Sequence, residues 1–341
     1  MILDFSVESD MMIPSFISIE YHERGICMQD GWGREIDYLR LSVTDRCSLR
    51  CRYCMPAVGI VKRSHREILS VEECVEIAQA AVQLGVKKIR LTGGEPLVRR
   101  GLLEICRRLR AIPGLRELCL TTNGLDLPQL AAPLRAAGVD RLNISLDTLR
   151  RDRFSFLTRR EAPADLLSGI RAAEDAGFQN LKIDTVLIGG FNDDELEDFL
   201  QLTCQHLWEI RFIELMPMGP CAAWPASAFL PVQTVLSRFP QLEPLAPEGV
   251  ARRFRLPGAP GAVGLISPLS HSFCASCRRV RVTADGRLKS CLHSREELSL
   301  RGLHGPELKA AIRQGILEKP RRHHLETGPS HTPRTMNQIG G

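Results

Sequence analysis

Three cysteines lie close together in the segment RCSLRCRYCMP, residues 46–56, and could bind a metal centre. Cys47, Cys51 and Cys54 have the spacing C-x3-C-x2-C, and no fourth cysteine or histidine stands in the same segment. A structural zinc site is closed by four ligands. A cubane iron–sulfur cluster normally takes four cysteines, so three would leave one iron open to another ligand. The spacing favours such a cluster, with an incomplete zinc site or a chance group of cysteines as the alternatives.

A second group of three cysteines lies towards the end of the sequence, again without an obvious fourth ligand. Its members are Cys274, Cys277 and Cys291, spaced C-x2-C-x13-C. His271 and His293 stand close enough to complete a zinc site, but the repeated vacancy favours a second cluster with an open iron. Arg279 and Arg281 lie two positions apart on a strand predicted between Cys277 and Cys291. Residues at this spacing share a face of a strand, so both guanidinium groups point to one side. Such a pair would bind an anionic, planar or phosphorylated ligand.

Composition places the chain among ordinary globular proteins. It has 341 residues, of which 44% are hydrophobic and 25% are charged, and a net charge of +5. This mild basic excess does not argue for nucleic acid, and it is compatible with a local pocket for a small polyanion. No apolar run is long enough to span a membrane, and the N-terminal segment lacks the pattern of a signal peptide. We therefore expect a cytoplasmic protein that binds neither nucleic acid nor membranes.

The remaining cysteines are predicted to be plain buried thiols. In a reducing compartment, cysteines serve as metal ligands or core residues more often than as disulfides. The six are Cys27, Cys74, Cys106, Cys119, Cys204 and Cys221. Three histidines near the end of the chain, His323, His324 and His331, are expected to be solvated residues of a loop-like tail.

Short apolar strands alternate with amphipathic helical segments over residues 36–217. The predicted strands span 36–44, 87–94, 115–123, 141–148, 181–190 and 209–217. Helical segments between them include 71–85, 127–138 and 164–177. Ser70 and Glu73 form a capping-box signature before the first of these. The alternation predicts βα units and a parallel α/β sheet, and the pattern alone allows either an incomplete barrel or an open doubly wound sheet.

The composition of the sequence changes after residue 217. Proline-rich and glycine-rich segments appear, and Asp285 followed by Gly286 signals a β-hairpin. We predict a poorly ordered N-terminal extension (1–35), an α/β domain (36–217) and a smaller C-terminal module (218–341). Polar residues and glycines cluster just past the predicted strand ends, at 44–45, 93–95, 121–123, 145–147 and 189–190. Parallel α/β enzymes place their sites at this face of the sheet.

Four features near these strand ends resemble one enzyme superfamily. Tyr53 precedes the last cysteine of the first group, and the next strand ends in TGGEP, residues 92–96. Ser145 in NISLD and Met216 at the sixth strand end complete a pattern that resembles radical S-adenosylmethionine enzymes. The resemblance implies that the first three cysteines ligate a [4Fe-4S] cluster and that Tyr53, Gly94, Ser145 and Met216 contact S-adenosylmethionine. In that superfamily the methionine group chelates the open iron, and electron transfer yields a 5′-deoxyadenosyl radical.

A longer set of ordered motifs narrows the resemblance to one family. YLRLSVTDRCSLRCRYCMP, IRLTGGEPLVRR, RFIELMPMG, FCASCRRVRVTADGRLKSCL and a final IGG occur in this order over residues 36–341. They resemble GTP 3′,8-cyclases, which form (8S)-3′,8-cyclo-7,8-dihydroguanosine 5′-triphosphate in the first step of molybdenum cofactor biosynthesis. The resemblance implies an incomplete (βα)6 TIM-type barrel, closed on its open side by a C-terminal module that carries a second [4Fe-4S] cluster.

The same resemblance assigns a substrate site. Cys274, Cys277 and Cys291 would ligate the second cluster, whose open iron would bind the guanine edge. The GTP contacts would be Arg40, Arg90, Thr121, Lys182, Arg279, Val280 and Arg281, with Arg211 as a weaker candidate. Gly340 and Gly341 would form an active-site tail that reaches the substrate. Asp184 and Arg278 stand where the family usually has asparagine, and both departures could alter the nucleotide contacts.

The resemblance also implies partners. A protein such as flavodoxin or ferredoxin would donate electrons, cyclic pyranopterin monophosphate synthase would take the product, and a homodimer is expected because dimers are common in this family. Two alternatives stay open. One is a peptide-modifying radical S-adenosylmethionine enzyme with an auxiliary cluster. The other is a zinc-binding nucleic-acid module, which would leave TGGEP, the strand-end cations and the final glycines unexplained.

Overall fold

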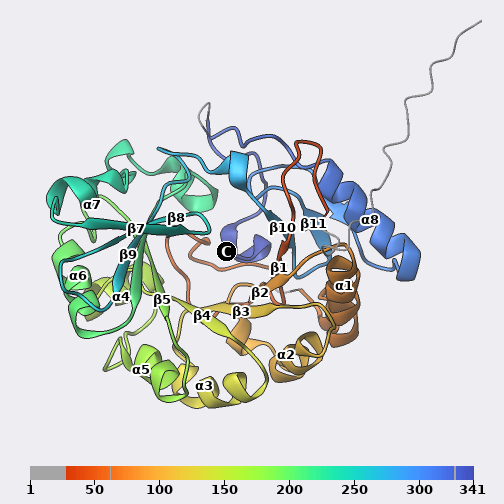
Figure 1. Cartoon of the computed structure of the whole chain (residues 1–341), viewed down its shortest axis with the longest axis horizontal. Helices are drawn as coiled ribbons and strands as arrows, with labels where there is room; N and C mark the ends of the chain where they lie inside the picture. The colour runs from red at the N-terminus through yellow and green to blue at the C-terminus, as the bar shows by residue number, and fades with distance from the viewer. Residues whose placement is uncertain (1–27, 62, 326–327) are drawn as a thin grey trace, which may run out of the picture.

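The computed structural model describes residues 28–61, 63–325 and 328–341. It is built around one curved sheet of twelve strands with helices on its outer side (Figure 1). The strands are β1 (Tyr38–Ser42), β2 (Lys88–Thr92), β3 (Glu117–Thr122), β4 (Arg141–Ser145), β5 (Lys182–Leu187), β6 (Glu209–Glu214), β7 (Glu243–Glu248), β8 (Ala251–Arg255), β9 (Ala262–Ile266), β10 (Arg279–Val282), β11 (Arg287–Lys289) and β12 (Leu298–Ser299). The α-helices are α1 (Val71–Gln83), α2 (Leu102–Arg110), α3 (Leu127–Ala136), α4 (Arg151–Thr158), α5 (Ser168–Asp175), α6 (Leu196–Gln205), α7 (Gln233–Arg238), α8 (Gly305–Leu317) and α9 (Met336–Ile339).

Strands β1 to β6 lie side by side in sequence order, and each neighbouring pair is parallel. β9 extends this row in parallel beyond β6, and β10 extends it beyond β1. In the described part of the chain β9 and β10 do not pair with each other, so the ring of parallel strands stays open between them. The predicted incomplete barrel is confirmed, and the open doubly wound arrangement is not adopted.

The βα units form where the sequence predicts them. α1 begins after Ser70, whose hydroxyl accepts a hydrogen bond from the Glu73 amide at 3.1 Å, while the Glu73 carboxylate accepts one from the Ser70 amide at 2.7 Å. This reciprocal capping box satisfies two amides that the helix itself cannot. Gly85 follows the helix with φ of 101°, a left-handed conformation that glycine adopts at little cost. The strands end earlier than predicted because the residues beyond them form the loops of the site.

The C-terminal residues add to both edges of the barrel sheet. β10, β11 and β12 lie beyond β1, whereas β9, β8 and β7 lie beyond β6. The sheet therefore contains strands from both sides of the domain boundary predicted at residue 217. The Asp285–Gly286 turn joins β10 and β11 as an antiparallel pair, as predicted. Figure 1 shows the chain end in the middle of the ring, beside the gap between β9 and β10.

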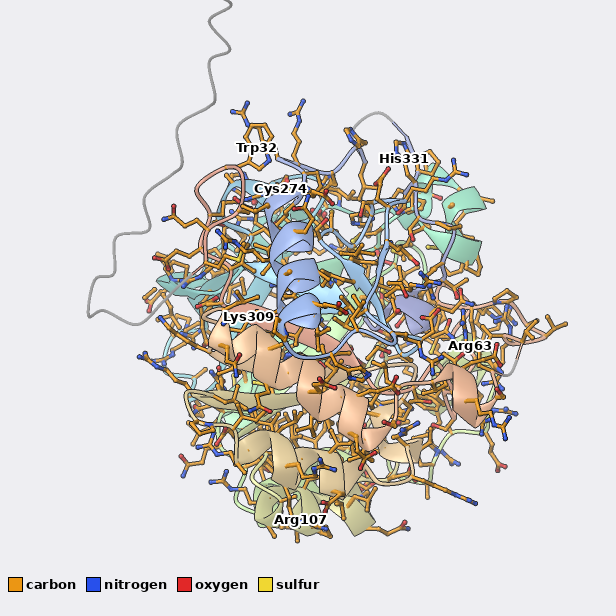
Figure 2. The ribbon with its side chains drawn as sticks, turned by 90° about the vertical axis from the view of Figure 1, so that its right-hand side faces the viewer. Trp32, Arg63, Arg107, Cys274, Lys309 and His331 are labelled. Atoms are coloured by element: carbon orange, nitrogen blue, oxygen red, sulfur yellow. The ribbon has the colours of Figure 1, made fainter. Side chains whose placement is uncertain are left out.

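Residues 28–35 fall in the predicted N-terminal extension. They form hydrogen bonds and ion pairs with the C-terminal module. The rest of that extension, with Cys27, lies outside the described residues. Arg34 is buried and pairs with Asp30 at 2.6 Å. Its guanidinium also donates to the carbonyls of Cys274 at 2.8 Å and Pro320 at 2.7 Å. Trp32 and Cys274 accordingly lie at the same end of the molecule (Figure 2).

Most of the scattered cysteines lie where the sequence predicts. Cys74, Cys106, Cys119 and Cys221 are buried. Cys204, on the outward side of α6, is exposed, so the prediction of a buried thiol is wrong there. Across the described ranges, no helix has the length and apolar character needed to cross a membrane.

Replacing Arg34 with alanine should destabilise the fold strongly, because Asp30 would keep a buried charge without its partner and several carbonyls would lose a donor. We expect the free energy of unfolding to fall by about 3–5 kcal/mol, as for other buried ion pairs that lose one partner. Chemical denaturation measures this change. Arg278→Ala is the matched control, since Arg278 pairs with Glu35 and Asp37 at the surface and such pairs contribute at most about 1 kcal/mol. Equal losses in both variants would contradict the account.

Candidate active site

One cavity of about 450 Å³ lies inside the barrel, and both groups of cysteines line it. Nearly all the residues assigned from the sequence are found in its wall. They are Arg40, Cys47, Cys51, Tyr53, Cys54, Arg90, Gly94, Thr121, Ser145, Lys182, Met216, Cys274, Cys277, Arg279, Arg281, Cys291 and Gly341. Gly340 stands next to this wall, and the side chain of Val280 is buried in the core behind it. The structure therefore brings together residues that are spread over 300 positions of the sequence.

The loop after β1 carries the first cysteines, and the glycines of TGGEP hold it close to β2. The Gly94 amide donates to the Thr44 carbonyl at 2.8 Å. A Cβ on Gly94 would lie 2.4 Å from the Arg46 carbonyl oxygen, and one on Gly93 would lie 2.4 Å from that of Thr44. Because backbone atoms cannot move aside, only glycine fits at either position. The close approach fixes the start of the cysteine loop against the end of β2.

Glu95, the acid of TGGEP, organises the next strand end. Its carboxylate accepts from the Thr122 hydroxyl at 2.7 Å, the Asn123 amide at 2.6 Å and the Leu97 amide at 3.0 Å. Burial raises the pKa of Glu95 to about 7, although these donors oppose the rise. Asn123 in turn donates from its side chain to Ser48 in the cysteine loop at 3.0 Å. Two strand ends and the cysteine loop are thereby tied into one unit.

The three cysteines of the first loop fit an iron–sulfur cluster by their donor chemistry. They are soft sulfur ligands on one short segment at the cavity wall. Burial raises the pKa of Cys47 to about 11 and that of Cys54 to about 12, so these thiols ionise only against a strongly positive centre. Among the described side chains no three histidines, cysteines or acids converge on a single-ion position.

Tyr53, Ser145 and Met216, the residues expected to contact S-adenosylmethionine, line the same cavity as the first three cysteines. Tyr53 donates its hydroxyl hydrogen to Asp147 at 2.8 Å. Asp147 also accepts from the Val186 amide at 2.8 Å, and burial raises its pKa to about 6. This carboxylate holds the Tyr53 ring in place.

Three arginines form a row on the opposite wall. Arg40 on β1 is in register with Arg90 on β2 and with Arg281 on β10, so their side chains stand at one level on adjacent strands. Arg90 and Arg281 are buried. Since three guanidinium groups repel one another, the row stays together only if acceptors or an anion surround it.

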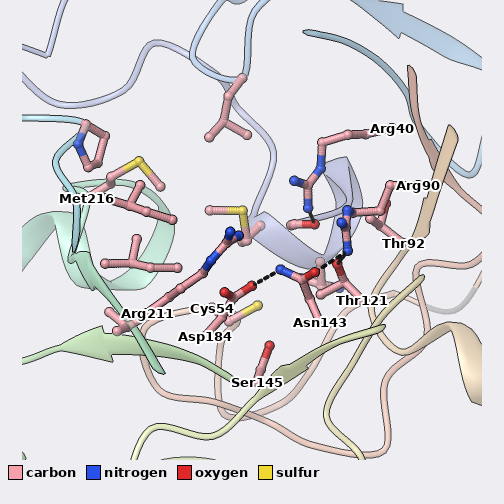
Figure 3. Close-up of a pocket in the computed structure, with 18 of the residues that line it drawn as sticks. Arg40, Cys54, Arg90, Thr92, Thr121, Asn143, Ser145, Asp184, Arg211 and Met216 are labelled. Carbon is pink, nitrogen blue, oxygen red and sulfur yellow. Dashed lines mark hydrogen bonds between the residues drawn. The ribbon is translucent and has the colours of Figure 1, made fainter. Parts of the chain in front are cut away.

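Polar groups of the barrel satisfy Arg90. It donates to the Tyr38 hydroxyl at 2.6 Å and to the Asn143 side chain at 2.7 Å, and Asn143 donates to Asp184 at 2.8 Å (Figure 3). Burial would raise the pKa of Tyr38, but Arg90 and Arg40 lower it to about 8. One oxygen of Asp184 is buried without a hydrogen-bond partner. Asp184 is therefore available to a donor group on a bound ligand.

The end of the chain supplies acceptors for the other two arginines. Arg281 donates to the Gly340 carbonyl at 2.6 Å, and Arg40 donates to the Gly341 oxygen. Gly340 has φ of 90°, and a Cβ there would lie 2.5 Å from the Thr92 hydroxyl. Only glycine can bring the backbone this close to the arginine row.

Arg334 fixes this tail to the C-terminal hairpin. It contacts both oxygens of Asp285 at 3.0 Å and both oxygens of Glu297 at 2.7 Å. Asn337, on α9, donates to the Asp45 carbonyl at 3.0 Å beside the first cysteine loop. The tail therefore contacts the loops of both cysteine groups.

Basic groups surround the second cysteine group and stabilise its thiolates. Burial opposes ionisation of Cys274, but a hydrogen bond with His323 lowers its pKa to about 7. Burial likewise opposes ionisation of Cys277, but Lys319 and Arg279 lower its pKa. His323 was expected to be a solvated tail residue, which is wrong, because it is buried against the Pro268 carbonyl at 2.9 Å.

The two proposed zinc ligands of this region differ in position. His293 lines the cavity and His271 does not. Arg278 points away from the cavity to Glu35 and Asp37. Arginine in place of the family's usual asparagine at this position therefore does not change the cavity wall. Asp184, by contrast, lies in the cavity wall.

Sequence reasoning missed several residues of the wall. They are Tyr38, Lys88, Arg141, Asn143, Glu248, Lys319 and His323. A signal existed for some of them, since polar residues at every second position of a buried strand must share a face. Tyr38 with Arg40, and Arg141 with Asn143 and Ser145, show this alternation.

Comparisons with solved structures show the fold. The chain superposes on the Streptococcus suis enzyme SuiB bound to its precursor peptide SuiA with a TM-score of 0.57 and 13% identity, covering 89% of this chain and 76% of that one. It superposes on anSMEcpe with bound AdoMet with a TM-score of 0.58 and 12% identity, covering 89% of both chains.

Comparisons of sequence show the family. The model of the radical SAM superfamily matches residues 41–203, and that of the molybdenum cofactor synthesis C domain matches residues 208–325. Curated GTP 3′,8-cyclases are similar over 92% of this chain: that of Peptoclostridium acidaminophilum is 48% identical over 98% of its length, and that of Geobacter sulfurreducens 48% over 99%. Membership of the superfamily implies a [4Fe-4S] cluster and S-adenosylmethionine. The chain belongs to the GTP 3′,8-cyclase family of radical S-adenosylmethionine enzymes.

Proposed function

We propose that this protein converts GTP to (8S)-3′,8-cyclo-7,8-dihydroguanosine 5′-triphosphate, the first step of molybdenum cofactor biosynthesis. One observation carries the proposal. Two groups of three cysteines face a single cavity, and a row of arginines lies on the adjacent strands β10, β1 and β2 in its wall. A site with one cluster for radical chemistry and a second beside a basic surface suits a nucleotide substrate. The curated relatives named GTP 3′,8-cyclase agree with this substrate.

The residues around the first cysteine loop position S-adenosylmethionine. Cys47, Cys51 and Cys54 would hold the first [4Fe-4S] cluster, and the bound cluster and S-adenosylmethionine supply the radical that removes hydrogen from GTP. Tyr53 and the backbone of Gly94 border this end of the cavity. Asp147 keeps the Tyr53 ring oriented.

The residues around the second group position GTP. Cys274, Cys277 and Cys291 would hold a second [4Fe-4S] cluster, which would supply a binding position for the guanine base. Lys319 contributes a nearby positive charge that favours thiolate ligands. The substrate contacts we propose are Arg40, Arg90, Thr121, Lys182, Arg279, Val280 and Arg281, with Val280 acting through its backbone because its side chain is buried. Guanidinium groups suit phosphate recognition because they donate in pairs.

The peptide-modifying alternative is compatible with this fold, since SuiB bound to precursor peptide SuiA superposes on the chain. That likeness, at 13% identity, carries no information about the substrate. The cavity favours a nucleotide, because its wall contains nine lysine and arginine side chains against four acidic ones. A neutral peptide would not compensate this charge, whereas a triphosphate would.

Partners follow from the reaction. The chemistry needs an electron donor of low potential, for which we propose a flavodoxin or a ferredoxin. The product would pass to cyclic pyranopterin monophosphate synthase. We also propose a homodimer, as is common in the family.

Anaerobic reconstitution with iron and sulfide tests the proposed reaction. Incubation with S-adenosylmethionine, a strong reductant and GTP should yield 5′-deoxyadenosine together with the cyclised nucleotide, both measured by mass spectrometry. Omitting GTP is the control. Formation of 5′-deoxyadenosine without any loss of GTP would refute GTP as the substrate.

Separate substitutions should divide the two cysteine groups. Cys54→Ser should abolish cleavage of S-adenosylmethionine. Cys274→Ser should spare that cleavage but abolish GTP conversion, and each variant should lose about half of the bound iron because each cluster holds four irons. Chemical iron analysis and product quantification measure these effects. A parallel loss of both activities in Cys274→Ser would argue against separate roles.

The Gly340 position gives a test of the tail. Gly340→Ala forces a Cβ against Thr92 and Ser42 at a left-handed φ, so the tail should be displaced from the arginine row. We expect cyclisation to fall by roughly 100-fold, as for misplaced active-site groups, with iron content and melting temperature unchanged. Gly328→Ala is the control, since a Cβ there meets nothing within 4 Å and φ is not left-handed. Full activity of Gly340→Ala would contradict a role of the tail in positioning.

A further inference from the structure

The tip of the β7–β8 hairpin reaches into the cavity. Glu248, Gly249 and Val250 form this tip, and all three line the cavity wall. The Glu248 carboxylate contacts the ammonium group of Lys182 and lies 3.0 Å from a guanidinium nitrogen of Arg141. A carboxylate of the protein therefore pairs with two cations that could otherwise bind an anionic ligand.

Glu248 differs from the other acidic residues of the wall. Glu95 and Asp147 accept from hydroxyl and amide groups, and Asp184 accepts from Asn143. Among the four carboxylates that line the cavity in the described ranges, only Glu248 forms ion pairs with cations of the same wall.

The two members of the main pair differ in their freedom to move. The Lys182 side chain is 6% exposed, whereas that of Glu248 is 36% exposed. Burial and the neighbouring Arg211 lower the pKa of Lys182 to about 8, and Glu209 and the contact with Glu248 oppose this. The buried ammonium thus depends on a nearby anion, while the half-exposed carboxylate can turn out into solvent.

The surroundings allow such an exchange. Arg141 also pairs with Glu117 at 3.3 Å, so it keeps one partner when Glu248 leaves. Gly249 has φ of 63° and a Cβ there would meet nothing within 4 Å, so the hairpin tip has open space beside it. β7 is an edge strand paired only with β8 among the described strands, and the pairing is irregular between Leu245 and Glu248.

We infer that Glu248 is an internal competitor for the phosphate groups of the nucleotide, and that it holds Lys182 and Arg141 until a polyphosphate displaces it. The inference rests on the proposed function for its ligand. A triphosphate carries several negative charges and replaces the single carboxylate, whereas an uncharged nucleoside gains nothing by displacing it. Glu248 is thus a residue that sets the affinity and selectivity for phosphorylated nucleotides.

Equilibrium binding to the reconstituted protein, without S-adenosylmethionine and therefore without turnover, tests this role. Isothermal titration calorimetry measures the affinity for GTP, guanosine and inorganic tripolyphosphate in the wild-type protein and in Glu248→Gln. We expect Glu248→Gln to bind GTP and tripolyphosphate roughly tenfold more tightly, a change of about 1.4 kcal/mol, and guanosine as before. Glu248→Asp, whose shorter side chain retracts from Lys182, should also bind both phosphates more tightly.

Glu243→Gln is the matched control, because Glu243 is an exposed residue at the start of the same hairpin. It should bind all three ligands like the wild type. Unchanged or weaker phosphate binding by both Glu248 variants would overturn the inference and make Glu248 a fixed partner of Lys182. If the wild type binds no GTP while Glu248→Gln binds tripolyphosphate more tightly, the competitor role stands and the proposed substrate fails. If no variant binds either phosphate, both fail.

Discussion

The parallel register of β10, β1 and β2 is the constraint on which the site depends. It places Arg281, Arg40 and Arg90 at one level on adjacent strands, inside a barrel that excludes most solvent. Like charges this close repel strongly where the dielectric is low, so the row must be compensated. The Tyr38 and Asn143 side chains compensate Arg90, and the backbone oxygens of Gly340 and Gly341 compensate the other two. An anionic substrate would add further negative charge beside the three arginines.

This constraint explains why Gly340 and Gly341 lie at the cavity. Two glycines bring carbonyl oxygens close to the arginines because no side chain intervenes. Arg334 anchors the tail to the hairpin that follows β10, and Asn337 anchors it to the loop that follows β1. The same two strands lead into the two cysteine groups. Hydrogen bonds and ion pairs therefore connect the tail, the arginine row and the cysteine loops to one another.

Much of the architecture could be predicted from the sequence, because strand and helix periods are local properties. The six βα units, the cap at Ser70 and the Asp285–Gly286 turn were all predictable in this way. The spacing of the two cysteine sets indicated metal centres, although the spacing alone left a zinc site open. Glu248 and His323 were not, since a hairpin tip and a tail loop reach the cavity only through tertiary packing. The TGGEP glycines were expected to admit a ligand, whereas their tightest contacts are with the backbone of the cysteine loop.

The central claim is that both cysteine groups act on one nucleotide in one cavity. GTP carrying deuterium at C3′ tests this most directly, with the isotope content of the 5′-deoxyadenosine formed by the reconstituted enzyme measured by mass spectrometry. The account predicts that one deuterium appears in 5′-deoxyadenosine in proportion to the cyclised product. Formation of 5′-deoxyadenosine without deuterium, while GTP is consumed, would show that the radical does not reach C3′ of the bound nucleotide and would contradict the account.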